Sequence, residues 1–327
     1  MRAWVVTNPG DPSALKLESR PEPEPRADWI KIRIRGFGIN RSELYTRQGH
    51  SGDDVPFPRV LGIECAGEVV DAGGTDLEVG DRVVVAMGGM GRRYDGGYAE
   101  FTLAPRRQVM RIESDLPWAT LAAFPETYFT AWTSIFDDLK AKPGQTILVR
   151  GGTSSVGLAA LQILSDLGCR TIATTRGEAK RARLMDAGCD DVVIDGGTIA
   201  SAVRALVPEG VDGVLELVGS VASVADSAKT IRPGGHLCHT GLLAGEWGRE
   251  LDPMPAGVGY SFGNSDRVEY ERWTPIAQTI ADRLAAGRYS PNIDTVFEFE
   301  EVVAAHERME NNRAAGKLVV VHGPADQ

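Results

Sequence analysis

The sequence predicts an α/β protein of two domains, one of which is built on a doubly wound parallel sheet. The chain has 327 residues, which exceeds the ~250–300 residues at which single cores stop growing. From Pro143 onward, strand-like and helix-like segments alternate, as in βαβ folds. A glycine-rich stretch, Gly151–Gly157, lies where the first of these strands meets the first helix, the usual place of a dinucleotide loop.

The first 120 residues indicate a β-rich segment. Short runs of strand-forming residues occur at Trp29–Arg35, Cys65–Val70 and Arg82–Ala86, and a turn-forming cluster at Asp71–Thr75 separates two of them. The glycine-rich stretch Met87–Gly97 is not followed by a helical pattern, so it predicts a hairpin or surface loop and not a phosphate loop.

The middle of the chain alternates regularly. Strands are expected at Thr146–Val149, Arg170–Thr175, Asp191–Ile194, Val211–Val218 and His236–Thr240, and helices at Val156–Leu167 and Glu178–Ala187. Each of these helices is followed by a glycine, Gly168 or Gly188, which is a common helix stop signal. Repeated strand–helix–strand units with short loops predict a parallel sheet with helices on both faces.

The end of the chain returns to a mixed pattern. Helices are expected at Pro275–Ala286 and Glu300–Asn311, and strands at Thr295–Phe299 and Lys317–Val321. Lys317 could approach the adenosine phosphate of a dinucleotide, but we expect it to be a solvated charge beside the last strand.

Composition narrows the function classes. The formal net charge is -10, and an acidic surface repels phosphate backbones, so nucleic acid is not the expected partner. The four cysteines form no CxxC pair, and we expect them to be buried thiols. The sequence has neither a signal-peptide pattern at its first residues nor an apolar run of the roughly 18–20 residues that a membrane span requires. A cytoplasmic location is therefore the expectation.

The loop after the first strand of the alternating region predicts a dinucleotide site. Its residues are Gly151, Gly152, Thr153, Ser154, Ser155, Val156 and Gly157. Small residues allow the pyrophosphate to approach the backbone, and the free amides of the following helix attract the anion. The middle glycine of the usual pattern is replaced by Ser155. The position of the loop between a strand and a helix makes the prediction specific.

The end of the next strand predicts the phosphorylated cofactor. NAD sites usually carry a carboxylate about 20 residues beyond the loop, but here Thr175 is followed by Arg176, with Lys180 one helical turn further. Cations suit the 2′-phosphate of NADPH. The nearest acid, Glu178, stands three residues after Thr175, which is capping-box spacing, so we expect it to cap its own helix.

Several motifs together resemble the medium-chain dehydrogenase/reductase superfamily, and most closely its zinc-free quinone oxidoreductase (zeta-crystallin-like) family. Besides the glycine loop, the motifs are Gly62–Val69, Val79–Val83, Gly97–Glu100, Thr130–Trp132 and Gly316–Val319. The resemblance implies a GroES-like partial β-barrel catalytic domain at residues 1–120 and 265–327. It also implies a Rossmann NADPH-binding domain at 121–264, and members of the family are commonly homodimers or tetramers, so we expect a homodimer.

The resemblance also implies which residues to examine for zinc. In zinc alcohol dehydrogenases the metal is bound by two cysteines and a histidine, and the matching positions here are Asn40, Ile63 and Glu126. Isoleucine cannot bind a metal, so no metal site is expected. Without zinc to stabilise an alkoxide, hydride donation to an already polarised acceptor is the easier reaction.

By the same resemblance, Asn40, Tyr45 and Thr130 are the candidate catalytic residues. The family pattern around Gly38–Gly49 places Asn40 near the nicotinamide as a hydrogen-bond donor, and Tyr45 as a donor or proton source. Other roles remain open: Asn40 as a helix cap, Tyr45 as a core aromatic, and Thr130 as an ordinary helix hydroxyl. His50 is a reserve proton donor. The resemblance also places Phe262, Gly263 and Asn264 where relatives close over the nicotinamide. Independently of it, Gly241, Leu242 and Leu243 follow the fifth strand, and ligands bind beyond the carboxyl ends of such strands, so we expect this loop to face the cofactor.

The sequence therefore predicts a zinc-independent oxidoreductase that transfers a hydride from NADPH to a quinone or an α,β-unsaturated carbonyl. An enoyl-thioester reductase is the alternative within enzymes, with Arg92 and Arg93 as a basic entrance. A non-catalytic NADPH-binding or sensory protein is the alternative from another class, because one fold serves many functions.

Overall fold

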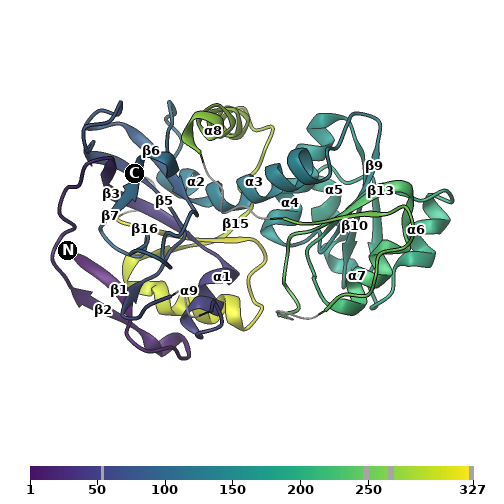
Figure 1. Ribbon diagram of the computed structural model, residues 1–327, viewed down its shortest axis with the longest axis horizontal. Coiled ribbons are helices and arrows are strands. Elements are labelled where there is room, and N and C mark those ends of the chain that lie inside the picture. Colours follow the sequence, from purple (N-terminus) through teal and green to yellow (C-terminus); the bar gives the residue numbers. More distant parts are fainter. Residues whose placement is uncertain (53–54, 246–249, 264–268, 324–327) are drawn as a thin grey trace. The chain divides into compact units, whose positions relative to one another are not determined.

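The computed structural model describes residues 1–52, 55–245, 250–263 and 269–323. The chain divides into two compact units, one formed by Met1–Glu126 with Asp266–Gln327 and the other by Thr127–Ser265 (Figure 1). We expected the first boundary at residue 120, and the second, between 264 and 265, falls outside the described residues. The predicted α/β class is confirmed.

The first unit is built on two sheets. A seven-stranded sheet has the order β15-β16-β3-β5-β6-β8, with β7 also paired to β3, and a three-stranded sheet has the order β2-β1-β4. Their strands are β1 (Arg2–Val6), β2 (Leu15–Ser19), β3 (Trp29–Ile39), β4 (Arg59–Val60), β5 (Glu64–Asp71), β6 (Arg82–Ala86), β7 (Phe101–Pro105), β8 (Val109–Arg111), β15 (Ile293–Glu298) and β16 (Lys317–Val321). Apart from the parallel pair of β15 and β16, the strands pair antiparallel.

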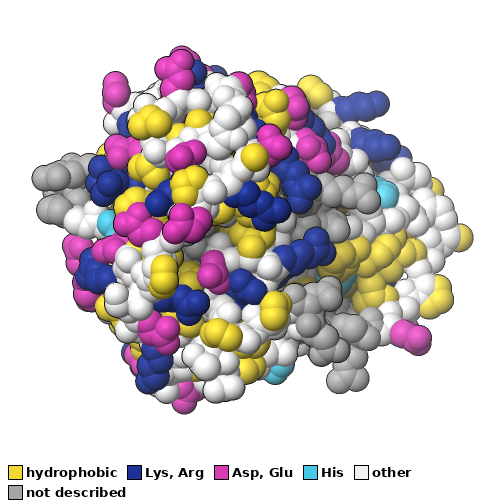
Figure 2. Space-filling view, turned by 60° about the vertical axis from the view of Figure 1, so that its left-hand side comes forward, with side chains coloured by type: hydrophobic (Ala, Val, Ile, Leu, Met, Phe, Trp, Pro, Cys, Tyr) yellow, Lys and Arg dark blue, Asp and Glu magenta, His cyan; other side chains and the backbone are white. Residues whose placement is uncertain are grey.

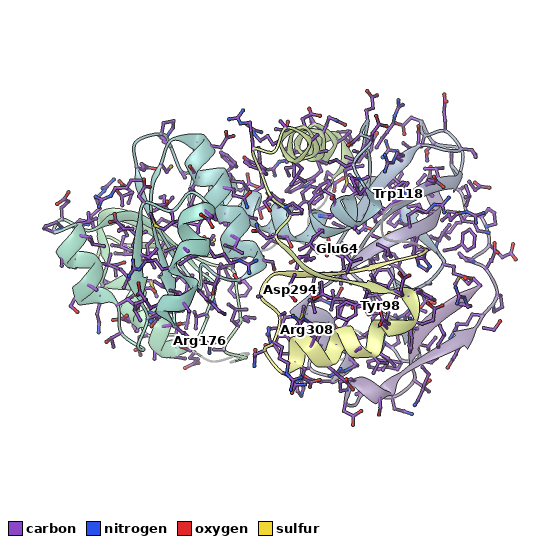
Figure 3. All side chains as sticks on the ribbon, turned by 180° about the vertical axis from the view of Figure 1, so that it is seen from behind. Glu64, Tyr98, Trp118, Arg176, Asp294 and Arg308 are labelled. Atoms are coloured by element: carbon purple, nitrogen blue, oxygen red, sulfur yellow. The ribbon has the colours of Figure 1, made fainter. Side chains whose placement is uncertain are left out.

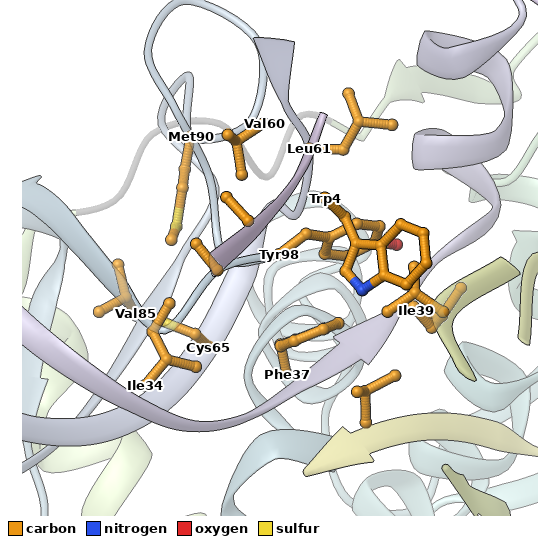
Figure 4. Close-up of a cluster of buried hydrophobic side chains, with 14 of the residues drawn as sticks. Trp4, Ile34, Phe37, Ile39, Val60, Leu61, Cys65, Val85, Met90 and Tyr98 are labelled. Atoms are coloured by element: carbon orange, nitrogen blue, oxygen red, sulfur yellow. The ribbon is translucent and has the colours of Figure 1, made fainter. Parts of the chain in front are cut away.

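Apolar residues of these strands, together with Tyr98 just before β7, make the core of the first unit. Trp4, Ile34, Phe37 and Tyr98 are at most 7% exposed, and they pack together as Figure 4 shows. The helices of this unit are α1 (Arg41–Arg47), α2 (Trp118–Ala123), α8 (Tyr270–Ala285) and α9 (Val302–Glu310), and α3 (Pro125–Trp132) begins at its edge. On the face that Figure 2 shows, charged side chains of both signs are interspersed.

The second unit contains the predicted parallel sheet. Its strands have the order β11-β10-β9-β12-β13-β14, and every pair is parallel. They are β9 (Thr146–Arg150), β10 (Arg170–Thr175), β11 (Asp191–Ile194), β12 (Val211–Glu216), β13 (Ile231–His239) and β14 (Gly259–Phe262). The strand order reverses between β9 and β12, and in open sheets ligands bind beyond the carboxyl ends of the strands at such a reversal.

The helices of the second unit are α4 (Ser155–Leu167), α5 (Arg181–Asp186), α6 (Ala200–Leu206) and α7 (Val221–Ala228). Gly168 follows the last residue of α4, and its φ of 83° lies in the left-handed region, as expected for a glycine that ends a helix. The helix expected at Glu178–Ala187 is shorter, because Glu178–Lys180 forms a 3₁₀ turn before α5. Among the described residues, no helix combines the length and apolar character needed to cross a bilayer.

Candidate functional site

The loop between β9 and α4 has the geometry of an anion site. Ser154 is the N-cap of α4, and its Oγ accepts a hydrogen bond from the backbone N–H of Gly157 at 3.1 Å. A Cβ at Gly157 would lie 2.7 Å from the carbonyl oxygens of Gly151 and Gly152, so only glycine fits there. The 13-residue helix α4 adds its free N-terminal amides and partial positive charge. These residues fit the pyrophosphate of a dinucleotide.

Two exposed cations follow the carboxyl end of β10. The side chains of Arg176 (Figure 3) and Lys180 make no hydrogen bond or ion pair with any residue in the described ranges. The capping box expected between Thr175 and Glu178 is wrong. Thr175 is the last residue of β10, and Glu178 forms an ion pair with Arg181. Arg176 and Lys180 are thus available to an anion beside the loop.

A buried arginine at the carboxyl end of β9 binds two carboxylates from other elements of the second unit. Arg150, the last residue of β9, is 1% exposed. Its Nε donates to Asp195 at 2.8 Å, just beyond β11, and its Nη1 donates to Asp226 on α7 at 3.2 Å. Glu216, at the end of β12, is also buried, and burial raises its pKa. Sequence reasoning missed this network, although an arginine closing the apolar strand Thr146–Val149 was a signal for it.

The other predicted cofactor residues lie in the same unit. Gly241, Leu242 and Leu243 follow β13, so they lie at the carboxyl edge of the sheet together with the glycine loop and Thr175. Phe262, on β14, is 53% exposed, and its ring centroid lies 5.0 Å from that of His239. Thr130 is buried in α3, and its carbonyl accepts a hydrogen bond from Ser134 Oγ at 2.8 Å. Asn264 lies outside the described residues.

In the first unit, Asn40 is the N-cap of α1. The Glu43 carboxylate accepts hydrogen bonds from the backbone N–H groups of Asn40 at 2.8 Å and of Ile63 at 3.0 Å. Tyr45 lies on α1 and is partly buried, and His50 is exposed beyond the end of that helix. The Asn40 and Tyr45 of the family pattern are thus held by one short helix.

Lys317 is buried, so the expectation of a solvated charge is wrong. β16 lies between β15 and β3 in the sheet, and all five of its residues are buried. The Lys317 ammonium donates to Asn40 Oδ1 and to Glu64 Oε1, each at 2.5 Å, and lies 3.9 Å from Glu126 Oε2. Burial alone would lower the pKa of Lys317, but the nearby charges of Glu64 and Glu126 outweigh it and raise that pKa.

Both ends of the Asn40 amide are occupied. Its Nδ2 donates to Glu64 at 2.8 Å and to Glu43 at 3.3 Å, while its Oδ1 accepts from Lys317. Gly38 makes room for this arrangement, because a Cβ there would lie 2.2 Å from Glu64 Oε1 and 2.5 Å from Lys317 Cε. We call Asn40, Glu43, Glu64, Glu126 and Lys317 the Asn40 cluster.

The residues at the family's zinc positions do not fit a metal. Ile63 has no ligating atom, and the oxygen of the Asn40 amide faces the Lys317 ammonium, a cation that repels another. Within the described part of the chain, no group of three or more His, Cys, Asp or Glu residues is arranged to hold a metal ion.

The buried Glu43 carboxyl predicts a specific dependence of stability on pH. Burial raises the pKa of Glu43 from 4.5 to about 7, so between these values the folded state holds a proton that the unfolded state releases. Stability therefore falls as the pH rises through this window. Relative to Glu43→Gln, we expect the wild type to lose as much as ~3 kcal/mol across it.

Denaturant titrations of both proteins at several pH values measure this difference. Glu113→Gln, at a carboxyl whose side chain is 78% exposed, is the control. A stability difference between wild type and Glu43→Gln that does not change across the window would contradict the prediction.

Comparisons with known proteins agree with this architecture. Residues 26–114 match the model of an alcohol dehydrogenase GroES-like domain, and residues 187–320 match the model of a zinc-binding dehydrogenase. The first match lies within the first unit, which is thus GroES-like, whereas the second match begins in the second unit and runs into the first. The parallel sheet of the second unit is Rossmann-like.

Full-length relatives show the same likeness. The human synaptic vesicle membrane protein VAT-1 homolog is 27% identical, with 99% of this chain and 87% of the relative covered. A quinone oxidoreductase of Lama guanicoe is 26% identical, with 98% and 97% covered. A mycobacterial structure complexed with NADPH has a TM-score of 0.85 at 25% identity, with 98% and 99% covered. The chain belongs to the medium-chain dehydrogenase/reductase superfamily and, within it, to the zinc-free quinone oxidoreductase family.

Proposed function

We propose that the protein is an NADPH-dependent reductase that transfers a hydride to a quinone or an α,β-unsaturated carbonyl without zinc. The observation that carries the proposal is Arg176 at the carboxyl end of β10, on the same sheet edge as the Gly151–Gly157 loop, with a side chain that pairs with no described residue. A guanidinium there suits a 2′-phosphate, which it can bind with two parallel hydrogen bonds. The quinone oxidoreductase relatives and the NADPH complex of a structural relative support it.

The cofactor residues have distinct roles in this proposal. The amides at the start of α4 bind the pyrophosphate, and Ser154 keeps that helix end ordered. Thr175, Arg176 and Lys180 form the ribose-phosphate side of the site. Gly241, Leu242, Leu243 and Phe262 cover the cofactor. When bound, NADPH supplies the hydride equivalent of the reaction.

The catalytic residues stabilise the charge that develops on the acceptor. Hydride addition to the β-carbon or ring of the acceptor leaves negative charge on its carbonyl oxygen. An N–H of the Asn40 amide donates to that oxygen, and a donor placed where charge develops lowers the barrier. Tyr45 supplies the proton, and Thr130 positions the reacting groups.

Absorbance-monitored NADPH oxidation by the purified, chelator-treated protein tests the proposal. The panel contains quinones, enones and an enoyl thioester, with NADH as the comparison cofactor. We expect turnover with NADPH and a quinone or enone that survives chelation. Turnover of the thioester alone would favour the enoyl-thioester reductase, and tight NADPH binding without reduction of any acceptor would favour a binding or sensory protein. Activity that is lost on chelation and restored by zinc would contradict the zinc-free mechanism.

Three further predictions stand beside this proposal. We propose a small molecule as the substrate, a homodimer as the assembly and the cytoplasm as the location. Gel filtration with light scattering measures the assembly directly.

A further inference from the structure

We infer that Lys317 is a positioning residue that fixes the orientation of the Asn40 amide for catalysis. The inference rests on the proposed function, because it concerns how Asn40 is presented to the acceptor. Lys317 and Asn40 are far apart in the sequence, yet the ammonium and Oδ1 lie 2.5 Å apart in the interior of the first unit.

The ammonium leaves the amide one favourable orientation. A lysine ammonium only donates hydrogen bonds, and an ionised carboxylate only accepts them. With Lys317 on one side and Glu64 on the other, Oδ1 must face the lysine and Nδ2 must face the carboxylate, as the distances show. A flipped amide would place its oxygen against Glu64 and its N–H groups against the ammonium. Lys317 therefore sets which end of Asn40 can donate.

One of the two Asn40 N–H groups is held loosely. Nδ2 lies 2.8 Å from Glu64 Oε1 but 3.3 Å from Glu43 Oε1, and the second distance exceeds the usual range of an N–H···O bond. Glu43 also accepts two backbone N–H bonds, so it keeps partners when this contact is lost. The N–H that faces Glu43 is the one that an acceptor carbonyl captures.

Lys317 also offsets the negative charge around Asn40. Glu43, Glu64 and Glu126 all belong to the Asn40 cluster, and Lys317 lies within 4 Å of the carboxylates of Glu64 and Glu126. An uncompensated carboxylate beside Asn40 would repel the oxygen on which negative charge develops. Lys317 thus orients the Asn40 amide and also reduces the negative potential that the nearby carboxylates would exert on the oxyanion.

Gly38 is the local feature that allows the pair to form. Any Cβ at this position would overlap both Glu64 Oε1 and Lys317 Cε. The Gly38–Asn40 segment therefore contains both the donor, Asn40, and the glycine that makes room for the Lys317 side chain.

The test compares variants in a Glu64→Gln background, where removal of Lys317 leaves no ionised partner at position 64. The four proteins are E64Q, E64Q/K317M, E64Q/N40A and E64Q/N40A/K317M. We expect E64Q/K317M to have a kcat ~10–100-fold below that of E64Q, with the same KM for NADPH. In the N40A background, the Lys317 substitution should change kcat little, because groups that act through one another are not additive.

A matched control removes an ion pair elsewhere in the same unit. Arg308 and Asp294 pair at 2.7 Å, and R308M/D294N in the same background should keep the kcat of E64Q. Thermal unfolding of every variant is recorded alongside. If E64Q/K317M does not fold, the double variant K317M/E64M takes its place and is compared with wild type and N40A. Proteins often tolerate the replacement of a buried ion pair by apolar side chains.

The outcomes separate the inference from the proposed function. A kcat of E64Q/K317M within ~2-fold of E64Q overturns the inference, and so does a Lys317 effect of equal size with and without Asn40. A fully active N40A variant overturns the role of Asn40 in the proposed function, and the inference with it. A wild-type protein that reduces no acceptor overturns both. Loss of kcat that depends on Asn40, at an unchanged KM for NADPH, supports both.

Discussion

We expect Arg150→Met to lower the free energy of unfolding of the second unit by ~3–5 kcal/mol. The Arg150 guanidinium is enclosed by Asp195 and Asp226, whose side chains are 11% and 9% exposed, and it lies close enough to the buried Glu216 for their charges to interact. Methionine fills similar space but leaves these carboxyl groups without their cation. Each must then stay charged in a poorly solvated place or take up a proton.

A denaturant titration that follows the second unit measures this loss. Arg170→Met is the matched control, because Arg170 pairs with Asp191 in the same sheet, but at the surface, with side chains 44% and 30% exposed. We expect Arg170→Met to lower the free energy of unfolding by at most ~1 kcal/mol. An Arg150→Met variant that loses no more unfolding free energy than Arg170→Met would contradict a stabilising role of the buried Arg150. Lowering the pH should reduce the difference in unfolding free energy between Arg150→Met and wild type. At low pH the carboxyl groups that have lost Arg150 take up protons, which removes the unpaired charge.

Strong local patterns predicted much of the fold. The bounds of β10, β11 and β16 agree with the expected segments to the residue. β10 and β16 are rich in β-branched residues, and β10 begins shortly after a glycine that ends a helix. Such segments carry their own start and stop signals, so the sequence is enough to find them.

Weak local patterns hid other elements. α7 consists almost entirely of Val, Ala and Ser, and we did not predict it; its capping box uses a serine at both positions. β14 is a four-residue edge strand. The stability of such segments comes from packing on the sheet and not from propensity. The capping box expected at Thr175 failed because Arg181 binds the carboxylate of Glu178.

The residues of the candidate site also differ in whether a local sequence pattern points to them. The glycine loop and Arg176 could be proposed from the sequence because their chemistry lies in one short segment. Lys317 and Glu64 were missed as a pair because 253 positions separate them. Whether a charged side chain is buried depends on its partner, and only the fold brings the partner close. Gly38 is visible in the sequence, but the need for glycine there comes from the contact between Glu64 and Lys317, which only the fold brings together.

The second large effect that we expect concerns the choice of cofactor. Arg176→Ala should raise the Kd for NADPH ~10–100-fold and leave the Kd for NADH nearly unchanged, because charge-assisted hydrogen bonds to the 2′-phosphate are lost. Asp195 is an acid close enough to Arg176 for their charges to interact. Arg150 holds that carboxylate with two hydrogen bonds, which leaves the Arg176 guanidinium available to the cofactor.

Titration calorimetry of wild type, Arg176→Ala, Lys180→Ala and Arg181→Ala with both cofactors separates the contributions. Arg181 is the matched control, because it is a neighbouring cation that Glu178 already engages, and its loss should leave both affinities close to wild type. The NADPH affinity of wild type should fall with added salt more steeply than that of Arg176→Ala. An equal loss for NADH and NADPH would place Arg176 at the pyrophosphate that both cofactors share. The basis for preferring NADPH would then have to be sought at Lys180, the other cation that the described chain leaves unpaired at this edge.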